Sequence, residues 1–120
     1  MSDLSLSGLD KANILVIGDV MLDRYISGTV TRISPEAPVP VLLQTDEYVA
    51  LGGAGNVVAN LASLGATVTL ISVIGADNSA EEISNALDGL SDGKVKSVLV
   101  RDEDRPTTEK TRLVSGSQQI

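Results

Sequence analysis

The stretch GGAGNVVANLASLG, residues 52–65, joins paired glycines directly to a helical pattern. Val57, Leu61 and Leu64 follow one another at i, i+4 and i+7, and Val58 and Ala62 lie beside them, which predicts one apolar stripe along a helix. Gly65 is then expected to end the helix, because glycine readily adopts the left-handed conformation that closes many helices. Short apolar runs stand on both sides of this pattern, so the stretch indicates a strand, a helix and a second strand.

The apolar runs on either side are rich in β-branched residues. NILVIG (13–18) is typical of a strand buried on both faces of a parallel sheet, and TVTLISVIG (67–75) predicts a second buried strand. A second helix is predicted where Ser79 and Glu82 have the spacing of a capping box, and KVKSVLV (94–100) predicts a third strand. The order predicts an α/β fold with a largely parallel sheet. The second helix has an apolar stripe of Ile83, Ala86, Leu87 and Leu90.

A β-rich insertion of about 25 residues separates the first strand from the first helix, which is long for such a connection. We predict two extended pieces in it, residues 24–33 and 39–48. Prolines 35, 38 and 40 exclude a helix here and favour an extended path or the edge of a sheet. Residues 24–50 are therefore expected to form a small subdomain that stands off the main sheet.

Composition limits the class of protein. The chain has 120 residues, 42% of them hydrophobic, which is enough for one modest core. A net charge of −7 argues against nucleic acid or an anionic membrane as a partner. The sequence contains no cysteine and no histidine, which excludes disulfides, the usual zinc sites and catalysis by Ser-His or Cys-His pairs. The acidic start does not resemble a signal peptide, and we expect a cytoplasmic protein.

Two features are expected at the carboxyl edge of the sheet, where open α/β sheets bind ligands. GDVMLD (18–23) directly follows the first strand, and Gly52 and Gly53 open the first helix. Glycine lets backbone N–H groups approach a ligand, and the start of a helix presents unpaired donors, so a polar ligand fits this turn. Tight packing between helix and strand is an equally good explanation of paired glycines. A dinucleotide fingerprint is not supported, because Val58 occupies the third glycine position.

Four charged residues are candidates for ligand contacts. Asp23 is expected across from the glycine turn, where a carboxylate can accept two hydroxyl hydrogen bonds and so suits a sugar. For Asp19 a capping role in a turn is the favoured interpretation. Lys110 and Arg112 alternate in a fourth β-like piece, TTEKTRLVS (107–115), and project from one face. From these residues alone, a solvated basic face is favoured over a phosphate site.

Four segments in order and at familiar spacing carry a family resemblance, which covers roughly residues 11–120. Together they resemble the amino-terminal part of ribokinase-like (PfkB-type) sugar kinases. Within this family they are most similar to the branch that acts on D-glycero-β-D-manno-heptose 7-phosphate. The segments are ILVIGDVMLDRY (14–25), TRISPEAPVPV (31–41), GGAGNVVANLASLGA (52–66) and PTTEKTR with QQI (106–112 and 118–120).

The resemblance implies a fold and a set of binding residues. The fold is a mainly parallel sheet flanked by helices, with a small β lid inserted after the first strand, at about residues 24–50. The lid closes over the sugar and forms a homodimer contact. The implied sugar-phosphate ligands are Asp23 for sugar hydroxyls, Gly52, Gly53 and Asn56 for the pocket wall, and Lys110, Arg112 and Gln118 for the phosphate.

The resemblance also implies a reaction. The γ-phosphate of ATP is transferred, with Mg²⁺, to O1 of the heptose 7-phosphate in ADP-heptose biosynthesis, which supplies the lipopolysaccharide core. The family's Gly-Ala-Gly-Asp motif, which carries the catalytic base, is absent from these 120 residues. We therefore expect an amino-terminal fragment that contains no catalytic residue, binds no ATP or Mg²⁺ and is inactive by itself. A kinase for another sugar or a nucleoside, and a non-catalytic α/β binding module, are the alternatives.

Overall fold

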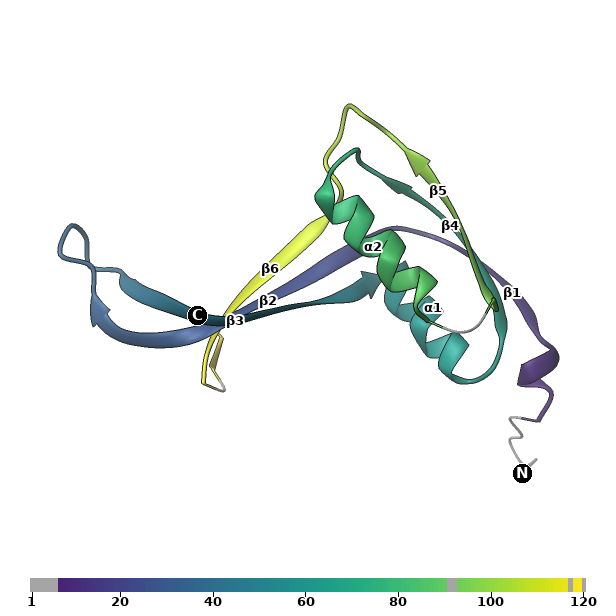
Figure 1. Cartoon of the computed structure of the whole chain (residues 1–120), viewed down its shortest axis with the longest axis horizontal. Coiled ribbons are helices and arrows are strands. Elements are labelled where there is room, and N and C mark those ends of the chain that lie inside the picture. The colour runs from purple at the N-terminus through teal and green to yellow at the C-terminus, as the bar shows by residue number, and fades with distance from the viewer. Residues whose placement is uncertain (1–6, 91–92, 117, 120) are drawn as a thin grey trace, which may run out of the picture.

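Two sheets and two helices make up the computed structural model, which describes residues 7–90, 93–116 and 118–119 (Figure 1). Strands β1 (Asn13–Ile17), β4 (Thr67–Ile74) and β5 (Val95–Arg101) form a parallel sheet in the order β1-β4-β5. The second sheet has the order β3-β2-β6-β7. The remaining elements are β2 (Val20–Ile33), β3 (Pro40–Gly53), α1 (Ala54–Ser63), α2 (Asn78–Asp88), β6 (Glu109–Ser115), β7 (Gln118–Gln119) and a 3-10 helix (Leu9–Lys11). The predicted order of strands and helices around a parallel sheet is confirmed.

The hydrophobic core lies between the parallel sheet and the two helices, which cover the same face of the sheet (Figure 1). Alternate residues of β4 are buried, as the period of two in a half-covered strand requires. The first residues of β2 also belong to this core, so the second sheet begins inside it. The core residues that are fully buried include Val20, Leu22, Val58, Val68, Leu70, Ile83 and Leu87.

The other face of the parallel sheet is open to solvent in the described chain. Leu15 and Ile17 of β1 are 57% and 72% exposed, and Val98 and Val100 of β5 are about half exposed. The prediction that residues 13–18 are buried on both faces is therefore wrong for this chain. The reason is that α1 and α2 both pack on the one side.

Helix α1 turns only part of its predicted apolar stripe to the core. Its buried residues are Gly55, Val58 and Ala62, whereas Val57 and Leu64 are about half exposed. The predicted stripe is confirmed for Val58 and Ala62, which are buried, and for Leu61, which packs against the core, and it is wrong for Val57 and Leu64. A side chain at Gly55 would place its Cβ 2.9 Å from Val20 Cγ2, so the glycine allows the helix to lie against β2. Packing between helix and strand thus explains one glycine of this stretch.

The end of α1 agrees with the sequence. Gly65 has a φ of +95° and donates its N–H to the carbonyl of Ala62 at 3.0 Å. The N–H of Ala66 reaches the carbonyl of Leu61 at 3.2 Å, which completes the pattern of a Schellman motif. The prediction that Gly65 closes the helix is confirmed.

Helix α2 begins one residue after Asp77, and not with a capping box. Asp77 accepts a hydrogen bond from the N–H of Ala80 at 3.0 Å, which makes it the N-cap. Ser79 lies inside the helix and donates to Glu109 of β6 instead, so the predicted pairing of Ser79 with Glu82 is wrong. The sequence alone did not reveal that β6 approaches the start of this helix.

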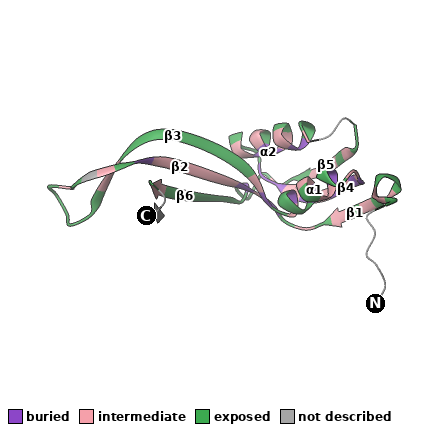
Figure 2. Cartoon of the chain, turned by 90° about the horizontal axis from the view of Figure 1, so that it is seen from below, coloured by how far each residue is buried: buried purple, intermediate pink, exposed green. Residues whose placement is uncertain are grey.

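The second sheet is built on a long hairpin that extends away from the helices (Figure 2). β2 and β3 pair antiparallel, and β6 runs parallel to β2 on its other side. Pro40 begins β3 at the edge of the sheet, as the prolines indicated. The strands extend beyond the predicted pieces because Val20 and Leu22 at the start of β2 are anchored in the core. No helix within the described ranges is long and apolar enough to span a membrane.

Candidate functional site

One face of the second sheet brings together four of the polar side chains that strands β2 and β6 carry. Asp23 of β2 is the register partner of Lys110 of β6, and Tyr25 is the partner of Arg112. Because side chains at every second position of a strand share a face, these four residues lie on the same side of the sheet. The structure therefore brings the predicted Asp23, Lys110 and Arg112 together.

Asp23 lies directly over the first glycine of the pair. A Cβ atom at Gly52 would be 2.8 Å from Oδ2 of Asp23 and 2.8 Å from Cγ of Met21, so only glycine leaves room for the carboxylate in this position. Oδ1 of Asp23 is buried and has no hydrogen-bond partner among the described residues. An unpaired buried carboxylate oxygen is costly, which indicates that a donor from a ligand belongs there.

Gly53 ends β3 in a conformation that other residues avoid, with φ of +57° and ψ of −132°. A Cβ at this position would lie 2.4 Å from the main-chain oxygen of Asp19. The same oxygen accepts the N–H of Ala54 at 2.8 Å and so ties the end of β1 to the start of α1. Asp19 thus contributes its carbonyl to this connection while its side chain is exposed.

The start of α1 adds backbone donors beside Asp23. No side chain of the described residues caps this helix end, and its first turn contains no acidic residue. Asn56 lies exposed in this first turn. The positive end of a helix dipole and its unpaired N–H groups favour an oxygen-rich ligand. Together with the unpaired oxygen of Asp23, this end of the helix forms the candidate site.

A row of three side chains crosses the same face one step further from the core. The rings of Tyr25 and Tyr48 stack with centroids 4.7 Å apart and planes 8° apart. Cζ of Arg112 lies 5.8 Å from the centroid of Tyr25, and Nε of Arg112 is buried without a hydrogen-bond partner among the described residues. Sequence reasoning missed both tyrosines. Tyr25 could have been identified from its spacing, because it lies two residues after Asp23 along β2 and so shares its face.

Two predicted contacts are placed differently from the rest. Lys110 is exposed at the surface, two residues before Arg112 in β6. The backbone of Gln118 pairs with Ser115, which in turn pairs with Gly28. Gly28 lies five residues beyond Asp23 along β2, about 17 Å for an extended strand. The structure does not bring the backbone of Gln118 to Asp23, and its side chain lies outside what is described.

The loop that leads into β6 is held by the cap of α2. The Thr107 hydroxyl donates to Asp77 Oδ1 at 2.6 Å, and its N–H donates to Oδ2 at 2.9 Å. These two bonds from Thr107, with a third from the N–H of Ala80, hold the pKa of Asp77 below its ordinary value. The Thr107 hydroxyl also accepts the N–H of Gly75 at 2.8 Å. Lys110 and Arg112 follow directly on this anchored loop.

We expect the Asp77 cap to make the chain sensitive to acid. A lowered pKa means that the stabilisation is fully present above the pKa of the unfolded chain, about 3.9, and is lost as pH falls through the folded value. Thermal unfolding measured between about pH 2.5 and 7 should therefore show a steeper loss of Tm below about pH 4 in the wild type than in Asp77→Asn. The control Asp88→Asn removes a carboxylate from the other end of α2 and should keep the wild-type slope. Equal slopes in both variants would contradict this assignment.

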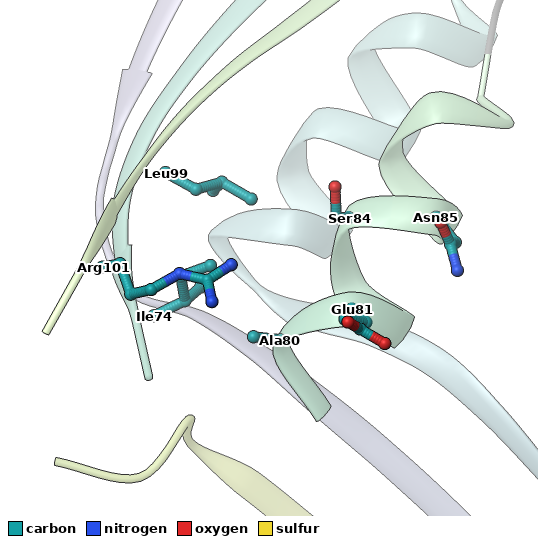
Figure 3. A pocket seen from close by; sticks show the side chains of 7 residues that line it. All are labelled: Ile74, Ala80, Glu81, Ser84, Asn85, Leu99 and Arg101. Atoms are coloured by element: carbon teal, nitrogen blue, oxygen red, sulfur yellow. The ribbon is translucent and has the colours of Figure 1, made fainter. Parts of the chain in front are cut away.

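Two cavities lie away from this face. One of about 360 Å³ opens between α2 and β5, where Arg101 reaches toward the helix that carries Glu81 (Figure 3). A smaller one of about 190 Å³ lies at the carboxyl ends of β1 and β4, beside Asp19. Neither cavity is lined by the unpaired atoms of Asp23 or Arg112. Within the described ranges, no group of three or more acidic side chains could hold a metal ion.

Comparison with known sequences points to one family. Residues 11–120 match the pfkB family carbohydrate kinases. The chain is 53% identical over 109 residues to the bifunctional protein HldE of Azorhizobium caulinodans, which covers 91% of this chain and 22% of that protein. It is 49% identical over 110 residues to the D-beta-D-heptose 7-phosphate kinase of Bordetella bronchiseptica, covering 92% of this chain and 34% of that one. The chain thus spans about a fifth to a third of the length of these relatives.

Solved structures agree on the fold. A carbohydrate kinase from Agrobacterium tumefaciens superposes with a TM-score of 0.68 at 26% identity, covering 87% of this chain and 32% of that one. A fructokinase with bound ATP from Xylella fastidiosa gives a TM-score of 0.61 at 21% identity, covering 85% of this chain and 29% of its own. The second likeness supports the fold alone. The predicted ribokinase-like α/β fold, present here as part of the full fold, is confirmed.

Proposed function

Because the chain belongs to the pfkB family of carbohydrate kinases, we propose that it forms the sugar-binding part of an ATP-dependent kinase for D-glycero-β-D-manno-heptose 7-phosphate. The kinase transfers the γ-phosphoryl group of ATP, with Mg²⁺, to O1 of the heptose. The product enters ADP-heptose biosynthesis for the lipopolysaccharide core in the cytoplasm. Support comes from two relatives that are about half identical to this chain, a bifunctional protein HldE and a D-beta-D-heptose 7-phosphate kinase.

The observation that carries this proposal is the buried, unpaired oxygen of Asp23. A sugar hydroxyl that donates to Oδ1 removes the cost of leaving that atom without a partner. Gly52 keeps the space beside the carboxylate open, and Gly53 brings the start of α1 next to it. Asn56 in the first turn of α1 then completes the wall of the sugar pocket.

The phosphate end of the substrate is assigned to β6. Nε of Arg112 is a buried donor on the face that carries Asp23, and it has no partner in the part of the chain that the structure describes. A guanidinium group suits a phosphate, since it offers several N–H donors in one plane. Lys110 adds a second positive charge one step closer to Asp23. Gln118 stays a prediction from the family resemblance.

Phosphoryl transfer depends mainly on positioning and on electrostatic stabilisation of the phosphates. The described residues supply the first of these for the sugar: they bind it and orient it. We assign the catalytic base, the ATP site and the Mg²⁺ ligands to residues outside these 120. The 120 residues by themselves are then expected to transfer no phosphate and to bind the sugar phosphate at roughly millimolar Kd, about −4 kcal/mol.

The test is a substrate panel on the protein that the complete gene encodes. With ATP and Mg²⁺, the heptose 7-phosphate should be phosphorylated with a kcat/KM well above those for heptose, fructose, ribose and nucleosides. Preference for one of the others would replace the substrate assignment. Absence of phosphoryl transfer to every compound would favour a non-catalytic binding module. The 120-residue chain is assayed beside it, and turnover above background there would show that a base lies within these residues.

We further propose that the β2–β3 hairpin acts as the lid over the sugar and as the contact of a homodimer. Its outer part is apolar and uncovered: Ile33 is 58% exposed and Leu43 is 66% exposed. The edge of β3 also leaves backbone groups unpaired, and such edges are usually covered by a partner. A second copy of the chain offers the same strand and the same apolar residues.

Leu43→Glu is expected to weaken this dimer, because the new carboxylate would be buried without a partner at the contact. The dissociation constant of the complete protein, measured by analytical ultracentrifugation, should rise at least about tenfold, or about 1.4 kcal/mol. Gln44→Lys adds a charge at the neighbouring position of β3, on its other face, where it can still donate to Glu47 as Gln44 does, and should leave association unchanged. A monomeric wild type, or equal effects of both variants, would contradict a contact through the hairpin.

A further inference from the structure

A cluster of charged side chains joins the second sheet to helix α2 on the face opposite to Asp23. Arg24 of β2 lies at its centre and donates from all three of its side-chain nitrogens. The acceptors come from three other elements. They are Glu47 of β3, Glu82 of α2 at 3.0 Å and Glu109 of β6 at 2.8 Å, and Glu109 also accepts the hydroxyl of Ser79 of α2 at 3.2 Å. We call these five residues the Arg24 cluster.

Arg24 supplies the positive charge that holds the carboxylates of the cluster together. Three carboxylates surround a single guanidinium group, so the cluster carries a net charge of −2. The hydrogen bonds that Arg24 donates to Glu82, Glu47 and Glu109 raise its pKa above the ordinary value. The Arg24 side chain is 19% exposed, and the carboxylates are about a third exposed. Without Arg24 the carboxylates would repel one another, and sheet and helix would lose their common partner.

The position of the cluster along β2 lets it influence the orientation of the candidate site. Leu22, two residues earlier and on the same face as Arg24, is fully buried in the core. Beyond Arg24 the hairpin extends away from both helices (Figures 1 and 2). The cluster therefore lies where the sheet leaves the body of the protein. Asp23 immediately precedes Arg24 in the same strand and points to the other face.

We propose that Arg24 is a positioning residue, which latches the second sheet to α2 and thereby holds Asp23 beside the start of α1. Arg24 does not touch the sugar, because it faces away from Asp23. Loosening the latch lets the sheet tilt relative to the helices, so Asp23 and Arg112 meet the sugar phosphate in more than one orientation. The part of this inference that concerns the substrate rests on the proposed function. The part that concerns the attachment of the sheet to α2 is independent of it.

The first test measures the attachment itself by hydrogen exchange of backbone amides in the protein that the complete gene encodes. Glu82→Gln removes the α2 charge and keeps the shape of the side chain. Its matched control is Glu81→Gln, the neighbouring carboxylate of α2, which is outside the cluster. Amides of residues 22–27 should exchange about three- to fivefold faster in Glu82→Gln than in the control, the size of a partly exposed ion pair. Equal exchange in the two variants would overturn the latch.

The second test separates positioning from a purely structural role. In Glu82→Gln the KM for the heptose 7-phosphate should rise about three- to fivefold, while kcat changes less than about twofold. High salt should raise the KM of all three proteins, because it also screens the substrate phosphate, but by a smaller factor in Glu82→Gln, which has already lost the ion pair with Arg24. Unchanged KM together with faster exchange would overturn the positioning role.

Arg24→Lys supplies the same comparisons if Glu82→Gln fails to fold. A lysine keeps the charge but cannot bond three carboxylates in one plane, so the exchange of residues 22–27 should be faster, and the KM higher, than in the wild type. A lysine variant that matches wild type in both measurements would overturn the role of the guanidinium. A wild type that phosphorylates no sugar phosphate would contradict the proposed function, and the exchange comparison would still decide the latch.

Discussion

Asp23→Ala should weaken binding of the heptose 7-phosphate by roughly 10- to 150-fold, since a hydrogen bond to a charged acceptor contributes about 1.5–3 kcal/mol. Oδ1 of this carboxylate is buried without a partner among the described residues, and removing the side chain removes the acceptor that a sugar hydroxyl would use. The measurement is calorimetric titration of the protein that the complete gene encodes. Circular dichroism should show an unchanged fold, because Asp23 has no hydrogen bond to the described chain through that oxygen.

Two further variants make the Asp23 result specific. Asp23→Asn keeps the shape and loses the charge, so its affinity should lie between wild type and alanine. Asp46→Ala removes an exposed aspartate from the same hairpin and should leave sugar affinity unchanged. Wild-type affinity in Asp23→Ala, or unfolding of that variant, would show that the carboxylate is structural.

Gly53→Ala should be the most destabilising single change at the site. The residue has a φ of +57°, and a Cβ there would lie 2.4 Å from the backbone oxygen of Asp19, which cannot move without breaking its bond to Ala54. Such a backbone position alone costs about 1–3 kcal/mol, and the clash adds to it. We expect a loss of at least about 3 kcal/mol in the free energy of unfolding, measured by urea denaturation.

Gly93→Ala separates the two causes. Gly93 has a φ of +72°, and a Cβ there would meet nothing within 4 Å, so this variant reports the conformational cost without a clash. Its loss should be no more than about 1–2 kcal/mol. Equal losses in the two variants would show that the contact with Asp19 contributes nothing.

Much of the fold could be predicted from local patterns. The strands around residues 13–18, 67–75 and 94–100 form as their apolar, β-branched runs indicated, and Gly65 ends α1. These features depend on the backbone preferences of a few consecutive residues, which the sequence states directly. Asp23 could also be chosen in advance, because its place after the first strand puts it at the carboxyl edge of the sheet.

Other features could not be predicted because they depend on contacts between distant residues. Val57 and Leu61 are both apolar residues of the predicted stripe, yet of the two only Leu61 packs toward the core. The face of α1 is chosen by the close approach of Gly55 to Val20. Likewise Ser79 is a good capping residue by type, but Asp77 caps α2, since Thr107 from a distant loop holds its carboxylate in place.

The sequence by itself determined the elements of this protein, their order and the candidate carboxylate, since each follows from the chemistry of neighbouring residues. Only the tertiary structure decided which groups meet: the pairing of β6 with β2 puts Arg112 beside Tyr25, and the approach of α2 puts Glu82 beside Arg24. Their positions differ by up to 87 in the chain, as Tyr25 and Arg112 show. No pattern of neighbouring residues encodes such pairs, because the sheet register and the packing of the core bring them together.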